Sequence, residues 1–315
     1  MSQKALLRDE MLRPDEIVIC KSSSPPGFSF LLKRQSFEPC DVRLLLFFPS
    51  HLTGKCPVVF VSIGSRGFES GREGLYANAL TQAGYAVVIA DSFESRGFDE
   101  TRTDQSRLSA AGACADAMAG LLALRDHPRI DANKAAVLGY SRGGTTSVLL
   151  SDERLQATTL PDGLQFRAHV ALYPSCSPQW EHPRPTSAPL IMLLGSADEM
   201  APAIKAQAYG EKLRAAGAQV DIRVFEGAHH SFDARHPVKA GPGMNLADTV
   251  FKIDQNGDFF EESTGMHGPE WAPFYKDVAR LRGVNKSITG HGPLPRDIAV
   301  RPILSFLEAA FAPKS

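Results

Sequence analysis

The most constraining feature of this chain is a short apolar segment that ends in a Gly-x-Ser-x-Gly motif. Residues 135–144 read Ala-Ala-Val-Leu-Gly-Tyr-Ser-Arg-Gly-Gly, and a run of small residues follows at 144–150. This pattern predicts a buried strand, a sharp turn and a helix that begins at once. Such a turn strains the backbone of Ser141, and side chains two positions away would collide with it. Gly139 and Gly143 remove those side chains, so we expect the Ser141 hydroxyl to stand at the carboxyl end of the strand as a nucleophile.

Length, charge and cysteine content narrow the class of protein. The chain has 315 residues, and its net charge of −1 gives no reason to expect nucleic acid or an anionic membrane as a partner. We see neither a secretory signal at the amino terminus nor an apolar run that would span a bilayer, so we expect a cytoplasmic protein. The five cysteines are scattered without CxxC spacing, which favours free thiols over disulfides or a metal site. We expect no metal and no cofactor.

Apolar strands alternate with helices along most of the chain, which predicts an α/β fold with a mostly parallel sheet and helices on both faces. Residues 1–27 are interpreted as a polar lead-in, and apolar runs at 28–33 and 42–48 predict an antiparallel pair at one edge of the sheet. Further strands are expected at 58–63, 85–90, 167–172, 190–194 and 219–225, and helices at 72–82, 111–125 and 206–216.

Residues 236–296 interrupt this alternation and are rich in Gly, Pro and polar side chains. We interpret them as an inserted, irregular segment that serves as a lid, a pocket wall or an interface arm between two copies. One hairpin is expected within it, and its Asn256-Gly257 pair predicts a type I′ turn. A helix at 297–311 then closes a single domain that spans residues 1–315.

The strand ends identify partners for the serine. A serine hydroxyl is a weak nucleophile at neutral pH, so it needs a histidine base and an acid that orients the base. In a parallel sheet these groups lie at the carboxyl ends of strands.

Two expected strands end shortly before Asp198 and before the pair His229-His230. We predict that Ser141, Asp198 and His230 form a catalytic triad. The alternatives are that Asp198 caps the next helix and that His229 is the base.

These motifs resemble those of the dienelactone hydrolase family of α/β hydrolases, from about residue 58 to residue 232. The matching landmarks are Ile-Asp-Ala-Asn-Lys, Gly-Tyr-Ser-Arg-Gly-Gly, Gly-Ser-Ala-Asp and Gly-Ala-His-His-Ser-Phe-Asp. The resemblance implies an α/β-hydrolase fold, with Ser141 as nucleophile, His230 as general base and acid, and Asp198 as its orienting acid. It favours His230 over His229, because the family places its histidine two residues before an aromatic residue. Dienelactone hydrolase itself uses a cysteine nucleophile, so the serine here resembles the esterase branches and the lactone substrate is not carried over.

An oxyanion hole requires two backbone N–H donors. One is expected from Arg142, the residue after the nucleophile. The other is expected from Ser65, or from Arg66, in the loop after the strand at 58–63. Family members often carry His-Gly in that loop, whereas this chain reads Ile-Gly-Ser-Arg-Gly.

Charged loop residues at the same edge are candidates for substrate binding. Arg66, Arg96 and Arg142 follow predicted strands, and a guanidinium matches a substrate carboxylate in bidentate fashion. Their alternative role is as solvated charges or as clasps to nearby glutamates. His229 is a further candidate for lining the site.

The sequence therefore predicts a serine hydrolase that cleaves a carboxylic ester or lactone of a small molecule through an acyl-enzyme. The same triad also serves amide, thioester and carbon–carbon bond hydrolases, which are the alternatives within the enzyme class. From another class, the alternative is a pseudo-hydrolase that binds a small molecule without turnover. A homodimer that uses residues 236–296 is a further expectation.

Overall fold

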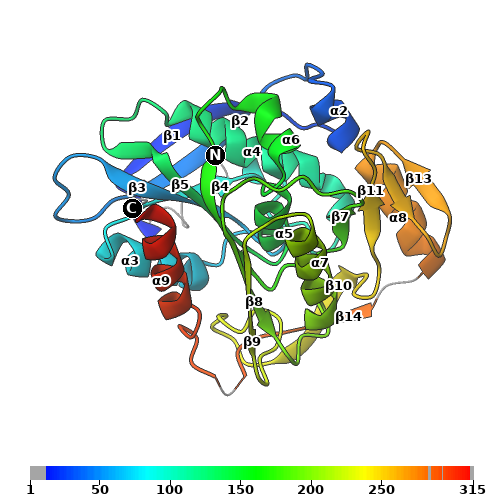
Figure 1. Ribbon diagram of the computed structural model, residues 1–315. Helices are drawn as coiled ribbons and strands as arrows, with labels where there is room; N and C mark the ends of the chain where they lie inside the picture. Colours follow the sequence, from blue (N-terminus) through cyan, green and yellow to red (C-terminus); the bar gives the residue numbers. More distant parts are fainter. Residues whose placement is uncertain (1–11, 283–284, 293, 313–315) are drawn as a thin grey trace.

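An eight-stranded sheet forms the centre of the computed structural model, which describes residues 12–282, 285–292 and 294–312 (Figure 1). The strand order is β1-β2-β4-β3-β5-β6-β8-β9, with antiparallel pairing of β1 with β2 and of β2 with β4, and parallel pairing from β4 onward. The predicted mostly parallel α/β sheet is confirmed. The strands are β1 (Glu16–Ser22), β2 (Cys40–Phe47), β3 (Cys56–Ser62), β4 (Ala86–Asp91), β5 (Ile130–Tyr140), β6 (Phe166–Leu172), β8 (Leu190–Gly195) and β9 (Val220–Phe225).

Helices cover both faces of this sheet, because its central strands bury alternate side chains in opposite directions. Val58 and Phe60 of β3 join one hydrophobic cluster with α4, whereas Val59 and Val61 join a second cluster with α3 and α9. A third cluster packs α7 on β8. The helices are α2 (Phe28–Leu32), α3 (Ser70–Gln82), α4 (Ala110–Ala123), α5 (Arg142–Leu149), α6 (Glu153–Thr159), α7 (Ala203–Ala215) and α9 (Val300–Phe311), with 3-10 turns η1 (Glu94–Arg96) and η2 (Gln105–Arg107).

The edge of the sheet differs from the sequence-based expectation. The edge strand beside β2 is β1, which lies within the segment interpreted as a lead-in. Residues 28–32 form the short helix α2 instead of a strand. A five-residue apolar run carries no periodicity that separates helix from strand. The lead-in interpretation was therefore wrong for residues 16–22, while residues 1–11 lie outside the described part of the chain.

The segment 236–296 is more regular than its composition indicates. Strands β11 and β12 form the expected hairpin and extend a small sheet in the order β13-β12-β11-β7, while β10 pairs with β14. The turn is not type I′, because Gly257 has a φ of 88° but Asn256 is not among the described residues with positive φ. The elements are β7 (Pro178–Trp180), β10 (Lys239–Asn245), β11 (Phe251–Ile253), β12 (Phe259–Glu261), β13 (Met266–Gly268), α8 (Trp271–Arg282) and β14 (Asn285–Thr289).

Parallel strands bring distant segments to one edge of the sheet. Ser141 directly follows β5, Asp198 follows β8, and His230 follows β9. The loop that carries Ser65 follows β3, which neighbours β5 in the sheet. In the part of the chain that the structure describes, no helix has both the length and the apolar character needed to cross a membrane.

Candidate active site

Ser141 occupies the sharp turn between β5 and α5 that the motif predicts. Its φ is 53° and its ψ is −112°, a conformation that residues other than glycine rarely adopt. A Cβ atom at Gly139 would lie 1.9 Å from the carbonyl oxygen of Gly143, and one at Gly143 would lie 1.9 Å from that of Ser62. The two glycines therefore permit the close backbone approach that holds Ser141 in place.

The three predicted triad residues meet in one hydrogen-bonded row. Nε2 of His230 lies 2.8 Å from Oγ of Ser141, and Nδ1 of His230 lies 2.8 Å from Oδ2 of Asp198. Asp198 is 5% exposed and His230 is 3% exposed, so the row is shielded from bulk water. An ionised carboxylate accepts hydrogen bonds only, so Asp198 fixes the proton of His230 on Nδ1 and leaves the Nε2 lone pair facing Ser141.

Asp198 has a second function in the same structure. Its Oδ1 accepts hydrogen bonds from the amides of Met200 and Ala201, each at 2.8 Å, in the turn that leads into α7. The carboxylate therefore caps this turn with one oxygen and orients His230 with the other. The N-cap of α7 is Pro202, so the alternative that Asp198 caps the helix itself is wrong, and Asp198 closes the turn before it.

The expected oxyanion-hole residues face the same cavity, and a glutamine that sequence reasoning missed connects them. Oε1 of Gln105 lies 3.2 Å from both Ser65 Oγ and Nη1 of Arg142. The carbonyl oxygen of Ser65 accepts hydrogen bonds from the amides of Thr101 and Arg102, which fixes the loop after β3. Arg142 is the first residue of α5, so its amide has no partner within the helix. No sequence signal marks Gln105, because it lies in a polar loop far from the motifs.

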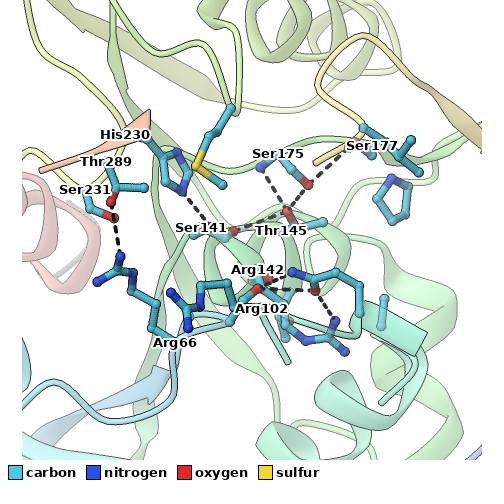
Figure 2. A pocket seen from close by; sticks show the side chains of 18 of the residues that line it. Arg66, Arg102, Ser141, Arg142, Thr145, Ser175, Ser177, His230, Ser231 and Thr289 are labelled. Carbon is cyan, nitrogen blue, oxygen red and sulfur yellow. Dashed lines mark hydrogen bonds between the residues drawn. The ribbon is translucent and has the colours of Figure 1, made fainter. Parts of the chain in front are cut away.

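The cavity beside Ser141 has an aromatic wall and a polar wall, and Figure 2 shows the polar one. Among the described residues, no carboxylate lines the cavity. Its volume of about 130 Å³ approaches the roughly 150 Å³ that accommodates a benzene molecule. Trp271 and Tyr275 of α8 and Phe251 of β11 form the aromatic wall, so the inserted segment contributes a side of the cavity. The residues that line the polar side include Ser65, Arg66, Arg72, Arg102, Gln105, Arg142, Thr145, Ser175, Ser177 and Thr289.

Arg142 is a partly buried cation without an ion-pair partner among the described residues. Its guanidinium donates to the carbonyl oxygens of Leu108 and Ser109 and to the side chain of Gln105. Burial lowers the pKa of Arg142 to about 10. A cation that faces a cavity and lacks a carboxylate partner is suited to an anionic group of a ligand.

Arg66 lines the cavity but is partly neutralised. Its guanidinium lies 3.4 Å from Oε1 of Glu69 and donates to Oγ1 of Thr289 at 3.3 Å. It also lies 3.2 Å from Nε2 of His236. Arg66 therefore joins the oxyanion loop to β14 of the inserted segment, on the side of Ser141 opposite Ser177 in Figure 2.

Two residues expected at the substrate site do not line this cavity. Arg96 forms a bidentate ion pair with Asp116, at 2.8 and 3.0 Å, and also donates to the carbonyl oxygens of Ser23 and Ser92. The expectation that Arg96 binds substrate is corrected, because these contacts occupy its guanidinium away from the cavity. His229 is likewise absent from the cavity lining, and its Nδ1 is buried without a partner among the described residues.

The sheet topology, the serine turn and the Ser–His–Asp row define an α/β hydrolase. The sequence model of the dienelactone hydrolase family matches residues 42–250, and the chain belongs to that family. The resemblance drawn from the motifs is thereby confirmed.

Solved structures share the fold at low sequence identity. One is a Klebsiella pneumoniae protein described as a candidate dienelactone hydrolase, with 21% identity and a TM-score of 0.51 over 70% of this chain and 89% of that one. Another is the propionate-bound Est2 esterase of Thermogutta terrifontis, with 17% identity and a TM-score of 0.51 over 71% of this chain and 87% of that one. A comparison with curated proteins finds no match to this chain.

Proposed function

We propose that the protein hydrolyses a carboxylic ester or lactone of a small molecule through an acyl-enzyme on Ser141. The observation that carries the proposal is the hydrogen-bonded row of Ser141, His230 and Asp198 at the edge of a cavity. Membership of the dienelactone hydrolase family and structural likeness to an esterase support the same reaction class.

In the acylation step, Oγ of Ser141 attacks the ester carbonyl carbon while its proton passes to Nε2 of His230. The amides of Arg142 and Ser65 donate hydrogen bonds to the oxyanion of the tetrahedral intermediate. The bond from carbon to the leaving oxygen then breaks, and His230 returns the proton to the leaving alcohol. Asp198 stabilises the imidazolium that exists between these transfers.

In the deacylation step, a water molecule takes the place of the alcohol. Its oxygen attacks the acyl carbon as its proton passes to Nε2 of His230. The bond from the acyl carbon to Oγ of Ser141 breaks, and the serine regains the proton from His230. The products are a carboxylic acid and the free enzyme.

We further propose that the preferred acyl or alcohol group carries a negative charge that contacts Arg142. The carboxylate-free cavity lining and the absence of an ion-pair partner for Arg142 among the described residues support this preference. Arg142 replaces Arg96 as the strongest candidate for this contact, since Asp116 already neutralises Arg96.

The test is hydrolysis of p-nitrophenyl esters and simple lactones by the wild type and by Ser141→Ala. We expect turnover by the wild type and its loss in a folded Ser141→Ala variant. Turnover of amides or thioesters instead of esters would indicate that the same triad cleaves an amide or thioester bond. Neither turnover nor labelling of Ser141 by a fluorophosphonate would support the binding-protein alternative.

A further inference from the structure

Lys205 of α7 points its ammonium group at the cavity wall instead of at a carboxylate. Its Nζ donates to Oγ of Ser177 at 2.9 Å and to the carbonyl oxygens of Ala247 and Thr249 at 2.5 and 3.3 Å. In the described part of the chain, no acidic side chain lies within ion-pair distance of it. An ammonium group has three N–H donors and no acceptor, so these contacts use all of its hydrogens.

This arrangement determines what Ser177 can do. Because Lys205 only donates, Oγ of Ser177 must accept from it, and the hydroxyl hydrogen of Ser177 must point elsewhere. None of the described residues accepts that hydrogen. Ser177 is 8% exposed, and it lines the cavity that contains Ser141. A nearly buried donor is therefore left for a ligand to satisfy.

The backbone of Ser177 is connected to the backbone of Ser141 through the hydroxyl groups of Thr145 and Ser175 (Figure 2). Oγ1 of Thr145 donates to the carbonyl oxygen of Ser141 at 3.3 Å or to Oγ of Ser175 at 3.0 Å. The amide of Ser177 in turn donates to Oγ of Ser175 at 3.4 Å. These hydrogen bonds connect Ser177 to the turn that carries Ser141, and both residues line the same cavity.

We propose that Ser177 is a specificity-determining residue that donates a hydrogen bond to an acceptor oxygen of the substrate, such as an ether, keto or hydroxyl oxygen. Lys205 acts through Ser177 by holding its hydroxyl in the donor orientation. This inference rests on the proposed ester hydrolysis and specifies the class of substrate: a small ester with an oxygenated acyl or alcohol group.

The apolar surroundings sharpen this selection. Pro178, Leu246 and Phe251 line the same cavity and offer no competing hydrogen-bond acceptor from their side chains. A methylene group placed against Ser177 leaves the donor unpaired in a buried site, which weakens binding about tenfold. Sites built to hydrogen-bond a substrate oxygen therefore reject analogues that lack it.

The experiment compares esters that differ only by replacement of a methylene group with oxygen. The acyl pair is p-nitrophenyl pentanoate and p-nitrophenyl 3-methoxypropanoate, and the alcohol pair is butyl butanoate and 2-methoxyethyl butanoate. For each pair, kcat/KM of the oxygen-containing ester is divided by kcat/KM of the methylene ester. This ratio is measured in the wild type and in Ser177→Ala at pH 7, below the pKa of about 8 of Lys205, so that the lysine is mostly an ammonium group. Comparing the same ratio between the two enzymes cancels the intrinsic reactivity of the esters.

We expect Ser177→Ala to lower this ratio about tenfold for one of the two pairs. A tenfold change corresponds to the loss of one hydrogen bond to a buried donor. Lys205→Met should lower the same ratio, because Ser177 then turns its hydrogen toward the backbone carbonyls that the lysine leaves. The matched control is Lys134→Met, a change at an exposed lysine on β5, which should leave the ratio unchanged. Unchanged ratios for both pairs in Ser177→Ala and Lys205→Met would overturn the inference.

A binding measurement separates this inference from the proposed reaction. If the wild type hydrolyses none of the four esters, calorimetry is used to measure the dissociation constants of the intact esters. The proteins are Ser141→Ala and the double variants that add Ser177→Ala or Lys205→Met. For each pair, the affinity for the oxygen-containing ester is compared with that for the methylene ester. A tenfold loss of oxygen preference there would support Ser177 while contradicting ester hydrolysis. Equal affinities for both members of each pair would contradict the inference itself.

Discussion

Tyr173 donates its hydroxyl hydrogen to Oδ1 of Asp233 at 2.7 Å, and its ring lies against His230. The ring of Tyr173 contacts the ring of His230 edge to face, with centroids 4.9 Å apart. Tyr76 donates to the other oxygen of Asp233 at 2.9 Å, and all four side chains are buried. Burial raises the pKa of Asp233, while Arg72 and the two hydroxyls oppose this shift. The network fixes the wall against which His230 rests.

Removing one hydroxyl of this network should slow the reaction without weakening substrate binding. In Tyr173→Phe, Asp233 loses one of its two tyrosine donors, and we expect a loss of about 1–3 kcal/mol in the free energy of unfolding. A less constrained His230 should lower kcat several-fold and leave KM nearly unchanged. The control is Tyr85→Phe, whose ring packs on Phe311 of α9. A rise in KM at constant kcat would show that Tyr173 acts on substrate instead of on His230.

Arg142 should control the preference for acidic esters. Arg142→Met keeps the backbone amide and removes the guanidinium, so we expect KM for p-nitrophenyl hemisuccinate to rise about 10–100-fold relative to p-nitrophenyl pentanoate. Arg107→Met provides the control, because Arg107 is a 42% exposed side chain of η2 outside the cavity lining. Equal effects of Arg142→Met on both esters would contradict the proposed preference for a charged substrate, but would not contradict ester hydrolysis.

The position of Arg96 relative to the cavity could not be predicted from the sequence. A loop position after a strand predicts that an arginine lies near the active site. It does not reveal that Arg96 forms an ion pair with Asp116 of α4, which lies 20 residues further along the chain. Gln105 was missed for the converse reason, since an ordinary polar residue acquires its role only when Ser65 and Arg142 meet it in space. By contrast, the meeting of Ser141, Asp198 and His230 could be predicted, because each follows a recognisable strand.

The same distinction applies to the fold. Alternating apolar strands and amphipathic helices predict the central sheet, because each such element must bury one face or both. Helix α2 depends instead on tertiary contacts: a Cβ atom at Gly27 would lie 1.9 Å from the carbonyl oxygen of Pro269, and the amide of Ser29 donates to Gly257. Helix α8 lies in a segment whose Gly and Pro content suggested irregular structure, although its buried aromatic residues follow helical spacing.

Gly143 should be essential to the serine turn. Gly143→Ala places a Cβ atom 1.9 Å from the carbonyl oxygen of Ser62, a distance that real structures do not tolerate. The backbone must shift, so we expect a loss of about 3 kcal/mol or more of stability, or a folded protein with at least a hundredfold lower kcat. Gly268→Ala is the matched control, since a Cβ atom there meets nothing within 4 Å. Similar behaviour of the two variants would contradict the close-approach account.

Lys205 should make stability depend on pH in the alkaline range. Burial lowers its pKa in the folded protein from 10.5 to about 8, so the unfolded chain binds more protons between these values. By linkage, this residue costs stability below pH 8, and its contribution to stability rises as the pH increases to 10.5. We expect this increase in the free energy of unfolding to be about 3 kcal/mol at most, and to be absent in Lys205→Met. Urea unfolding at several pH values, with Lys134→Met as control, measures it. Parallel curves for wild type and Lys205→Met would contradict the pKa shift.

The most direct test of the central claim is mass spectrometry of the intact protein, quenched in acid during turnover of a p-nitrophenyl ester. We predict a mass increase equal to the acyl group, located on the peptide that contains Ser141 and absent in Ser141→Ala. In the proposed mechanism His230 activates the water of deacylation, so we also predict that any adduct formed in His230→Ala persists longer than in the wild type. Turnover that continues in Ser141→Ala, or an acyl group located on another residue, would contradict an acyl-enzyme on Ser141.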